Sequence, residues 1–153
     1  MTTGLWVLIA AVVLALGVGA WRAVADGRFS RRGRVPGQTA AEAPGSATPS
    51  TWSDVAAAVP DVAPGERATL LQFSTAFCAP CRATRRTLAE VAELVPGVVH
   101  VEVDAEHHLE LVRRLGVLRT PTTLVLDAEG REVTRAAGAP RKEQVLGALG
   151  EVV

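Results

Sequence analysis

The stretch ATLLQFSTAFCAPCR, residues 68–82, combines a short apolar run with two cysteines that are separated by two residues. Residues 68–74 have the length and the apolar character of a buried strand. A helical pattern follows over about residues 79–95, with one apolar face at 3.6-residue spacing. Cys78 and Cys81 are therefore expected at the junction between a strand and the helix that follows it.

The sequence on both sides of this junction predicts further helices and strands. A capping pattern at residues 51–54 opens a short helix that runs to about Val59. A crossover helix between the first two strands and an antiparallel pair at the end describe a small mixed sheet with helices on both faces, an α/β fold class. The remaining elements are strands at 98–103, 122–126 and 131–137, a helix at 109–115, and a last helix with Pro140 in its first position.

The position of the cysteines favours thiol chemistry. Cys78 falls just before the first helical turn, where unpaired backbone N–H groups and the positive end of the helix dipole stabilise a thiolate. Cys81 lies one turn further on, within reach of Cys78 for a disulfide. Arg82, Arg85 and Arg86 follow closely. Arginine near a helix N-terminus opposes the dipole, so either support of a thiolate or a solvated helix face explains these residues.

Three interpretations of the cysteine pair compete. A redox site needs only C-x-x-C at a β-α junction. A zinc site needs four ligands, but His100, His107 and His108 do not have the usual spacing and are expected on the surface of a strand and a loop. A purely structural disulfide would close a loop too small to stabilise much. The redox interpretation is favoured, and neither a metal nor another cofactor is predicted.

Residues 68–150 resemble the thioredoxin family. C-x-P-C followed about 40 residues later by T-P-T ahead of a strand is a strongly specific combination. The resemblance implies a thioredoxin fold, with a central mixed β-sheet flanked by helices. It also implies a cis Thr120–Pro121 peptide bond that faces the cysteines, which an X-Pro bond permits at low cost. The matching pieces are TLLQFSTAFCAPCR, VHVEVDAE, Thr120-Pro121-Thr122 and Gly138.

By this resemblance the chain is a thiol–disulfide oxidoreductase that reduces protein disulfides. Cys78 would attack the target disulfide and Cys81 would resolve the mixed disulfide, leaving a Cys78–Cys81 pair. The backbone around Thr120 and Pro121 would bind the substrate chain. Protein disulfides are the expected substrates, and an electron donor is required that the sequence does not identify. The alternative is a binding or chaperone-like module that uses the fold without turnover.

Four residues depart from the family pattern. Thioredoxins place an acidic residue behind the cysteines as a proton acceptor, and the matching residue here is Gln72, which cannot titrate. Phe77 replaces the tryptophan before the first cysteine, Ser74 replaces another aromatic residue, and His100 stands where the family often has lysine. Without the acid, deprotonation of Cys81 is expected to rely on water or on the incoming thiolate.

The N-terminus predicts a membrane anchor. Residues 1–21 carry no charged side chain, and about 20 apolar residues at 1.5 Å each cross a hydrocarbon core of roughly 30 Å. Trp6 and Trp21 stand near the two ends of the run, where indole rings favour the headgroup region. The alternative is a cleaved signal peptide with Ala23-Val24-Ala25 as its cleavage site, but no Lys or Arg precedes the apolar run.

Charge predicts the organisation of the rest of the chain. Residues 22–34 hold five Arg and one Asp, which favours a single-pass cell-membrane protein with its C-terminal domain in the cytoplasm. The alternative is an extracytoplasmic reductase that serves cytochrome c maturation. The predicted parts are the anchor at 1–21, a basic flank and flexible Pro/Ala/Gly/Ser linker at 22–50, and a monomeric thioredoxin-like domain at 51–153. Equal numbers of basic and acidic residues, 16 each, argue against nucleic-acid binding.

Overall fold

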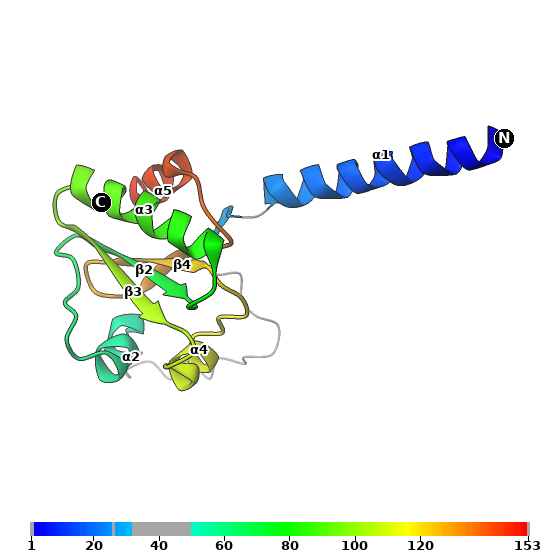
Figure 1. Cartoon of the computed structure of the whole chain (residues 1–153). Helices are drawn as coiled ribbons and strands as arrows, with labels where there is room; N and C mark the ends of the chain where they lie inside the picture. The colour runs from blue at the N-terminus through cyan, green and yellow to red at the C-terminus, as the bar shows by residue number, and fades with distance from the viewer. Residues whose placement is uncertain (1, 26, 32–49, 153) are drawn as a thin grey trace, which may run out of the picture.

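The computed structural model describes residues 2–25, 27–31 and 50–152, and Figure 1 shows the arrangement of its elements. The helices are α1 (Thr2–Ala25), α2 (Thr51–Ala58), α3 (Ala79–Leu94), α4 (Leu109–Arg114) and α5 (Lys142–Leu149). The strands are β1 (Phe29–Arg31), β2 (Ala68–Ser74), β3 (Val98–Asp104), β4 (Thr122–Asp127) and β5 (Glu132–Ala137).

The strands form one mixed sheet with the order β1-β5-β4-β2-β3. β2 and β3 run parallel, joined by the crossover helix α3, and every other neighbouring pair is antiparallel. The predicted α/β class, the crossover and the β4–β5 hairpin are confirmed. The first strand of the predicted domain, β2, lies inside the sheet between β4 and β3, which explains why every one of its residues is buried.

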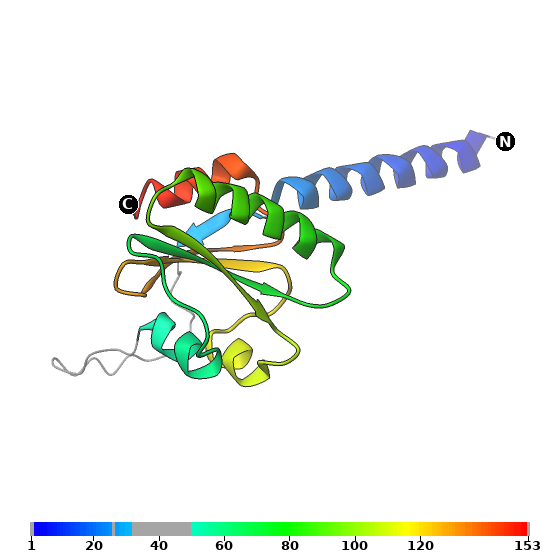
Figure 2. The same cartoon turned by 60° about the vertical axis from the view of Figure 1, so that its left-hand side comes forward.

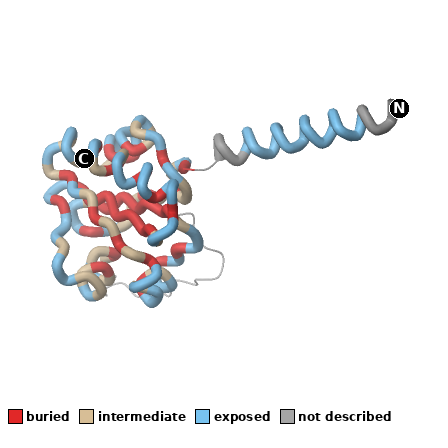
Figure 3. The backbone as a smooth tube through the Cα atoms, viewed as in Figure 1, coloured by how far each residue is buried: buried red, intermediate tan, exposed pale blue. Residues whose placement is uncertain are grey.

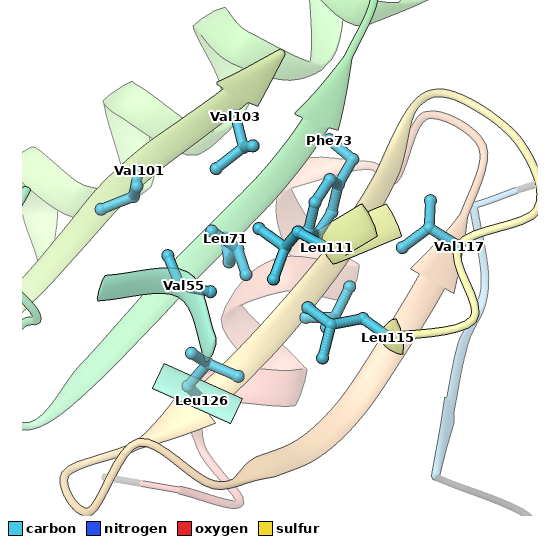
Figure 4. Close-up of a cluster of buried hydrophobic side chains, with 10 residues drawn as sticks. Val55, Leu71, Phe73, Val101, Val103, Leu111, Leu115, Val117 and Leu126 are labelled. Carbon is cyan, nitrogen blue, oxygen red and sulfur yellow. The ribbon is translucent and has the colours of Figure 1, made fainter. Parts of the chain in front are cut away.

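Helices cover both faces of the sheet. α3 and α5 lie on one face, and α2 and α4 lie on the other, as Figures 1 and 2 show. The strands between them hold about half of the buried residues (Figure 3). One apolar cluster packs the sheet against α2 and α4 (Figure 4), with Phe73 and Leu71 at 0% exposure. A second cluster packs the other face against α3 and α5, around Leu70 and Leu88. Each such side chain contributes roughly 1.5–3 kcal/mol by leaving water.

Alternation along β2 decides what faces the functional end of the domain. Leu71 and Phe73 enter the cluster with α2 and α4, whereas Leu70 enters the cluster with α3 and α5. Because successive strand residues point to opposite faces, Gln72 points with Leu70 toward α3. In the parallel pairing with β3, Gln72 lies opposite Glu102. A polar group is thereby built into the apolar layer directly under the helix that carries the cysteines.

Two predicted helix starts differ from the structure. The N-cap of α2 is Ser50, whose side chain accepts the Ser53 N–H, so the capping pattern begins one residue before Thr51. α5 begins at Lys142, with Arg141 as its N-cap, so the prediction that Pro140 holds the first helical position was wrong. The backbone N–H of Arg141 donates to the Gln144 side chain, which stabilises the helix start without proline.

β1 lies within residues 22–50, the predicted basic flank and flexible linker, where the sequence predicted no strand. Phe29 pairs with Ala136 of β5, and its side chain packs on the second apolar cluster. Just before the strand, the Gly27 N–H donates to the Ala137 carbonyl at 2.9 Å. Gly27 has φ +78°, and a Cβ there would lie 2.2 Å from the Ala139 carbonyl oxygen, so only glycine fits this approach. The rest of the predicted linker, residues 32–49, lies outside the described residues.

α1 is a helix of 24 residues that extends away from the sheet domain (Figure 1). The large apolar side chains described in it are exposed, from 43% for Ile9 to 73% for Trp21. Within the part of the chain that the structure describes, no helix has both the length and the hydropathy needed to cross a bilayer. The predicted anchor at residues 1–21 stays a prediction.

Candidate active site

Cys78 and Cys81 form a disulfide at the start of α3, with an S–S distance of 2.06 Å. Cys78 is the N-cap residue, as predicted, and its Sγ accepts the backbone N–H of Cys81 at 3.1 Å. Cys81 is 2% exposed and Cys78 is 9% exposed. The N-terminal residues of a helix have free N–H groups, so a sulfur in this position would be stabilised as a thiolate after reduction.

The cis-proline loop contacts the loop that leads to this disulfide. The Thr120–Pro121 peptide bond is cis, as the resemblance implied. The hydroxyls of Thr75, in the loop that leads to Cys78, and Thr120 are 3.3 Å apart and share a hydrogen bond. On its other side the loop is attached to the end of β5, because the Gly138 N–H donates to the Pro121 carbonyl at 2.7 Å.

Gln72 connects the buried cysteine to the neighbouring strand. Its side chain is fully buried, and its Nε2 donates to the Cys81 carbonyl at 3.0 Å. Its Oε1 lies 3.1 Å from Nε2 of His100, so the histidine supplies the donor of that bond. Burial lowers the pKa of His100, against the opposing effect of Glu102, while Arg85 lowers it further. His100 is therefore half-buried and bonded to Gln72, not a simple surface residue.

The carboxylate of Glu102, on β3, lines the same cavity as the two cysteines. Glu102 accepts hydrogen bonds from the Ser74 hydroxyl at 2.6 Å and from Arg85 Nη2 at 2.8 Å. Burial tends to raise the pKa of Glu102, but these two donors and the charge of Arg85 hold it below its usual value. In turn, the hydrogen bond that Arg85 donates to Glu102 raises the pKa of Arg85. The charge of Arg85 is paired with Glu102, which leaves Arg82 as the arginine beside the cysteines.

One hollow borders the disulfide, and a second is lined by both Thr75 and Thr120. One is a polar cavity of about 410 Å³ whose lining includes Cys78, Cys81, Arg82, Glu102 and Asp104. On the β3 side its lining is charged, because Glu102 and Asp104 belong to that strand. The other is an apolar hollow of about 220 Å³ beyond the Thr75–Thr120 contact, lined among others by Leu109, Val117 and Leu118.

The structure brings most of the predicted site residues together at one end of the sheet. These are Cys78, Cys81, Thr120, Pro121, Gln72 and His100. His107 lies apart from them, 2.8 Å from Asp104. The sequence analysis missed the Ser74–Glu102–Arg85 group. Its only signal is the alternation of VHVEVD, which places His100 and Glu102 on the same face of β3.

Comparison with known proteins supports this geometry. Thioredoxin from Alicyclobacillus acidocaldarius is 32% identical over 90 residues, which are 58% of this chain and 85% of that protein. Thioredoxin H-type 1 from Nicotiana tabacum is 31% identical over 74 residues, 48% of this chain and 58% of that protein. The chain spans less than two thirds of the length of this and two rice relatives.

A solved structure and a family model agree with these relatives. Thioredoxin from Fasciola hepatica superposes with a TM-score of 0.52 at 24% identity, covering 58% of this chain and 84% of that structure. This likeness shows the thioredoxin fold. The family model for the thioredoxin-like domain matches residues 56–152, which include both cysteines and the cis-proline. The chain therefore belongs to the thioredoxin-like domain family.

Proposed function

We propose that this protein is a thiol–disulfide oxidoreductase that reduces protein disulfides through Cys78 and Cys81. The observation that carries the proposal is the pair itself. A disulfide at the N-terminus of α3 joins the N-cap residue Cys78, which is 9% exposed, to Cys81, which is 2% exposed. Exchange needs one reachable, activated thiol and one protected partner.

The reaction starts from the reduced pair. The Cys78 thiolate attacks one sulfur of a target disulfide, a new S–S bond forms, and the other target sulfur leaves as a thiolate that takes up a proton. The Cys81 thiol loses its proton and attacks Cys78 Sγ, which releases the second target sulfur as a thiol. The target gains two electrons and two protons, and the Cys78–Cys81 pair loses them. A thiol reductant restores the pair, a dithiol protein in the cell or dithiothreitol in an assay.

Gln72 and the polar cavity shape the second step. Gln72 cannot accept a proton, but it donates to the Cys81 carbonyl and so fixes the first turn of α3. The cavity beside Cys81 admits solvent and is lined by Glu102. The Cys81 thiol therefore gives its proton to solvent or to the leaving target thiolate.

Insulin reduction with dithiothreitol tests this activity. The wild type should accelerate precipitation of the insulin B chain, and Cys78→Ser should remove the acceleration. In a separate reaction without dithiothreitol, reduced Cys81→Ser mixed with insulin should accumulate a mixed disulfide, visible as a gel shift that later addition of dithiothreitol reverses. Equal rates for wild type and Cys78→Ser would overturn the proposal and favour a binding module without turnover.

We propose further that α1 tethers the protein to the cell membrane with the thioredoxin-like domain in the cytoplasm. Support comes from the uncharged run of residues 1–21, the exposed apolar side chains of α1, and the five arginines that follow. A 24-residue helix is about 36 Å long. Sedimentation of the chain with membranes in alkaline carbonate tests the tether. Fusion of a compartment-specific reporter after Val153 tests the orientation, and reporter activity only outside the cytoplasm would contradict it.

A further inference from the structure

We propose that the redox-active end of the domain is held against the membrane surface, so that its substrates are disulfides within a short distance of the bilayer. The inference rests on the proposed activity and tether. The sequence predicts only a basic flank and a flexible linker between the anchor and the domain, with no contact that fixes one against the other. In the structure, β1 attaches the chain to the sheet directly after α1.

The connection between α1 and the sheet is very short. α1 ends at Ala25, and the N–H of Gly27 is already bonded to the Ala137 carbonyl at 2.9 Å. Successive Cα atoms are 3.8 Å apart, so the end of α1 lies within about 8 Å of Gly27. Pairing of Phe29 with Ala136 then holds this exit point on the edge of the sheet.

The exit point adjoins the active site. The Ala137 carbonyl that accepts the Gly27 N–H also accepts Arg119 Nη2 at 2.8 Å, from the loop that precedes the cis-proline. The next residue, Gly138, donates to the Pro121 carbonyl at 2.7 Å. Ala137 and Gly138, at the end of β5, therefore connect the end of the tether to the substrate-binding loop.

The arrangement of the elements agrees with these contacts. α1 leaves the sheet domain on the side where α3 begins, and both Figure 1 and Figure 2 show this. The cysteine pair lies at that end of α3. With α1 as the membrane tether, the end of the domain that carries the disulfide is the end nearest the membrane.

The surface of this end suits that position. The two most exposed large apolar side chains described in residues 50–152 are Phe77, at 101%, and Leu118, at 96%. Phe77 directly precedes Cys78, and Leu118 lies in the cis-proline loop beside the apolar hollow. Exposed apolar side chains at a membrane-facing end match a substrate segment that emerges from the bilayer with apolar residues near its cysteines.

A test varies the height of the disulfide above the membrane and keeps its concentration there constant. The full chain is reconstituted into phosphatidylcholine vesicles together with a palmitoylated disulfide peptide. The disulfide is placed either next to the lipid chain or beyond a long Gly/Ser spacer. Dithiothreitol supplies the electrons. The wild type should reduce the short-spacer peptide at least about fivefold faster, because the fixed geometry raises its effective concentration.

Two insertions of the same Gly/Ser segment, about 15 residues long and spanning roughly 20 Å, form a matched pair. Inserted after Asp26, the segment separates α1 from β1 and should abolish the preference. Inserted after Ala40, between β1 and α2, it lengthens the chain equally, leaves the α1–β1 junction intact and should keep the preference. Equal rates for the two peptides in wild type, or the same preference in both insertion variants, would overturn the inference.

Failure of the proposed activity, failure of the tether and failure of this inference give different results. Reduction of the same peptide without palmitate, in detergent, reports the activity alone, and its absence would overturn the proposed reductase. Failure of the chain to float with the vesicles would overturn the tether and this inference together. Normal activity in detergent and normal flotation without a height preference would overturn this inference only.

Discussion

The amide of Gln72 is oriented by His100, whose Nε2 lies 3.1 Å from the Gln72 Oε1. With its oxygen occupied, the amide presents its nitrogen to the carbonyl of Cys81, at 3.0 Å. Gln72 and His100 thus form a hydrogen-bonded pair beside Cys81, at the position where the resemblance to thioredoxins led us to expect an ionisable acid. Reactivity of the cysteines is thereby separated from the titration of a buried carboxyl.

Replacement of Gln72 by aspartate should restore that coupling at a cost in stability. The buried carboxyl would either stay protonated or lose solvation, so we expect a loss of about 2–3 kcal/mol. The rate of thiol alkylation against pH should gain a second ionisation. Gln72→Leu is the control, since it removes the same hydrogen bonds without adding a titrating group, and its profile should keep the wild-type shape. Superimposable profiles for Gln72→Asp and wild type would contradict the prediction.

His100 should make the fold less stable at mildly acidic pH. Burial lowers the pKa of His100 from 6.5, so the unfolded chain binds the proton more strongly. The stability that the fold has with neutral His100 is fully present above pH 6.5 and is lost as the pH falls through the pKa of His100 in the folded state. Glu102 and Arg85 face His100 and are not altered by His100→Gln, which keeps a donor for Gln72. In urea denaturation at several pH values, the free energy of unfolding should fall less steeply below pH 6.5 for His100→Gln than for wild type. Parallel curves of this free energy against pH for the two proteins would refute the prediction.

The ion pair of Glu102 with Arg85 should affect stability in a more acidic pH range than His100 does. The pKa of Glu102 lies below the ordinary value of 4.5, so its ion pair stabilises the fold above that value and is lost as the pH falls through the folded pKa. Arg85 is 57% exposed and Glu102 is 22% exposed, so we expect Glu102→Gln to cost only about 1 kcal/mol at neutral pH. The melting temperatures of wild type and variant should converge in acid. A difference that stays constant down to pH 3 would exclude the ion pair as its cause.

Removal of β1 should weaken the domain. In residues 51–153 alone, β5 becomes an edge strand with unpaired backbone groups, and the second apolar cluster loses Phe29. We expect the fragment 27–153 to be about 1–2 kcal/mol more stable in urea than the fragment 51–153. The shorter fragment should also self-associate in sedimentation velocity experiments. Identical denaturation midpoints and monomeric behaviour of both would show that β1 contributes nothing.

The local patterns that predict this fold are strong where burial is strong. The strand at 68–74 and the helix at 79–94 follow from an apolar run and a 3.6-residue period, and the cysteine spacing marks the site. β1 has no such signal, because FSR lies among arginines after an apolar helix and its partner is remote in sequence. The same holds for the Ser74–Glu102–Arg85 group, which exists only once the parallel register of β2 and β3 is set.

The pairing of β1 with β5 also sets the order in which the molecule can be built. Phe29 leaves the ribosome soon after α1, whereas its partner Ala136 follows 107 residues later (136 − 29). Contacts this distant in sequence form late, because closing so long a loop is costly until the intervening structure exists. During synthesis the nascent β1 must therefore wait, unpaired, until the β4–β5 hairpin has emerged. Attachment of β1 to the sheet therefore requires that β5 has been made, and a chain cut short before β5 could not complete it.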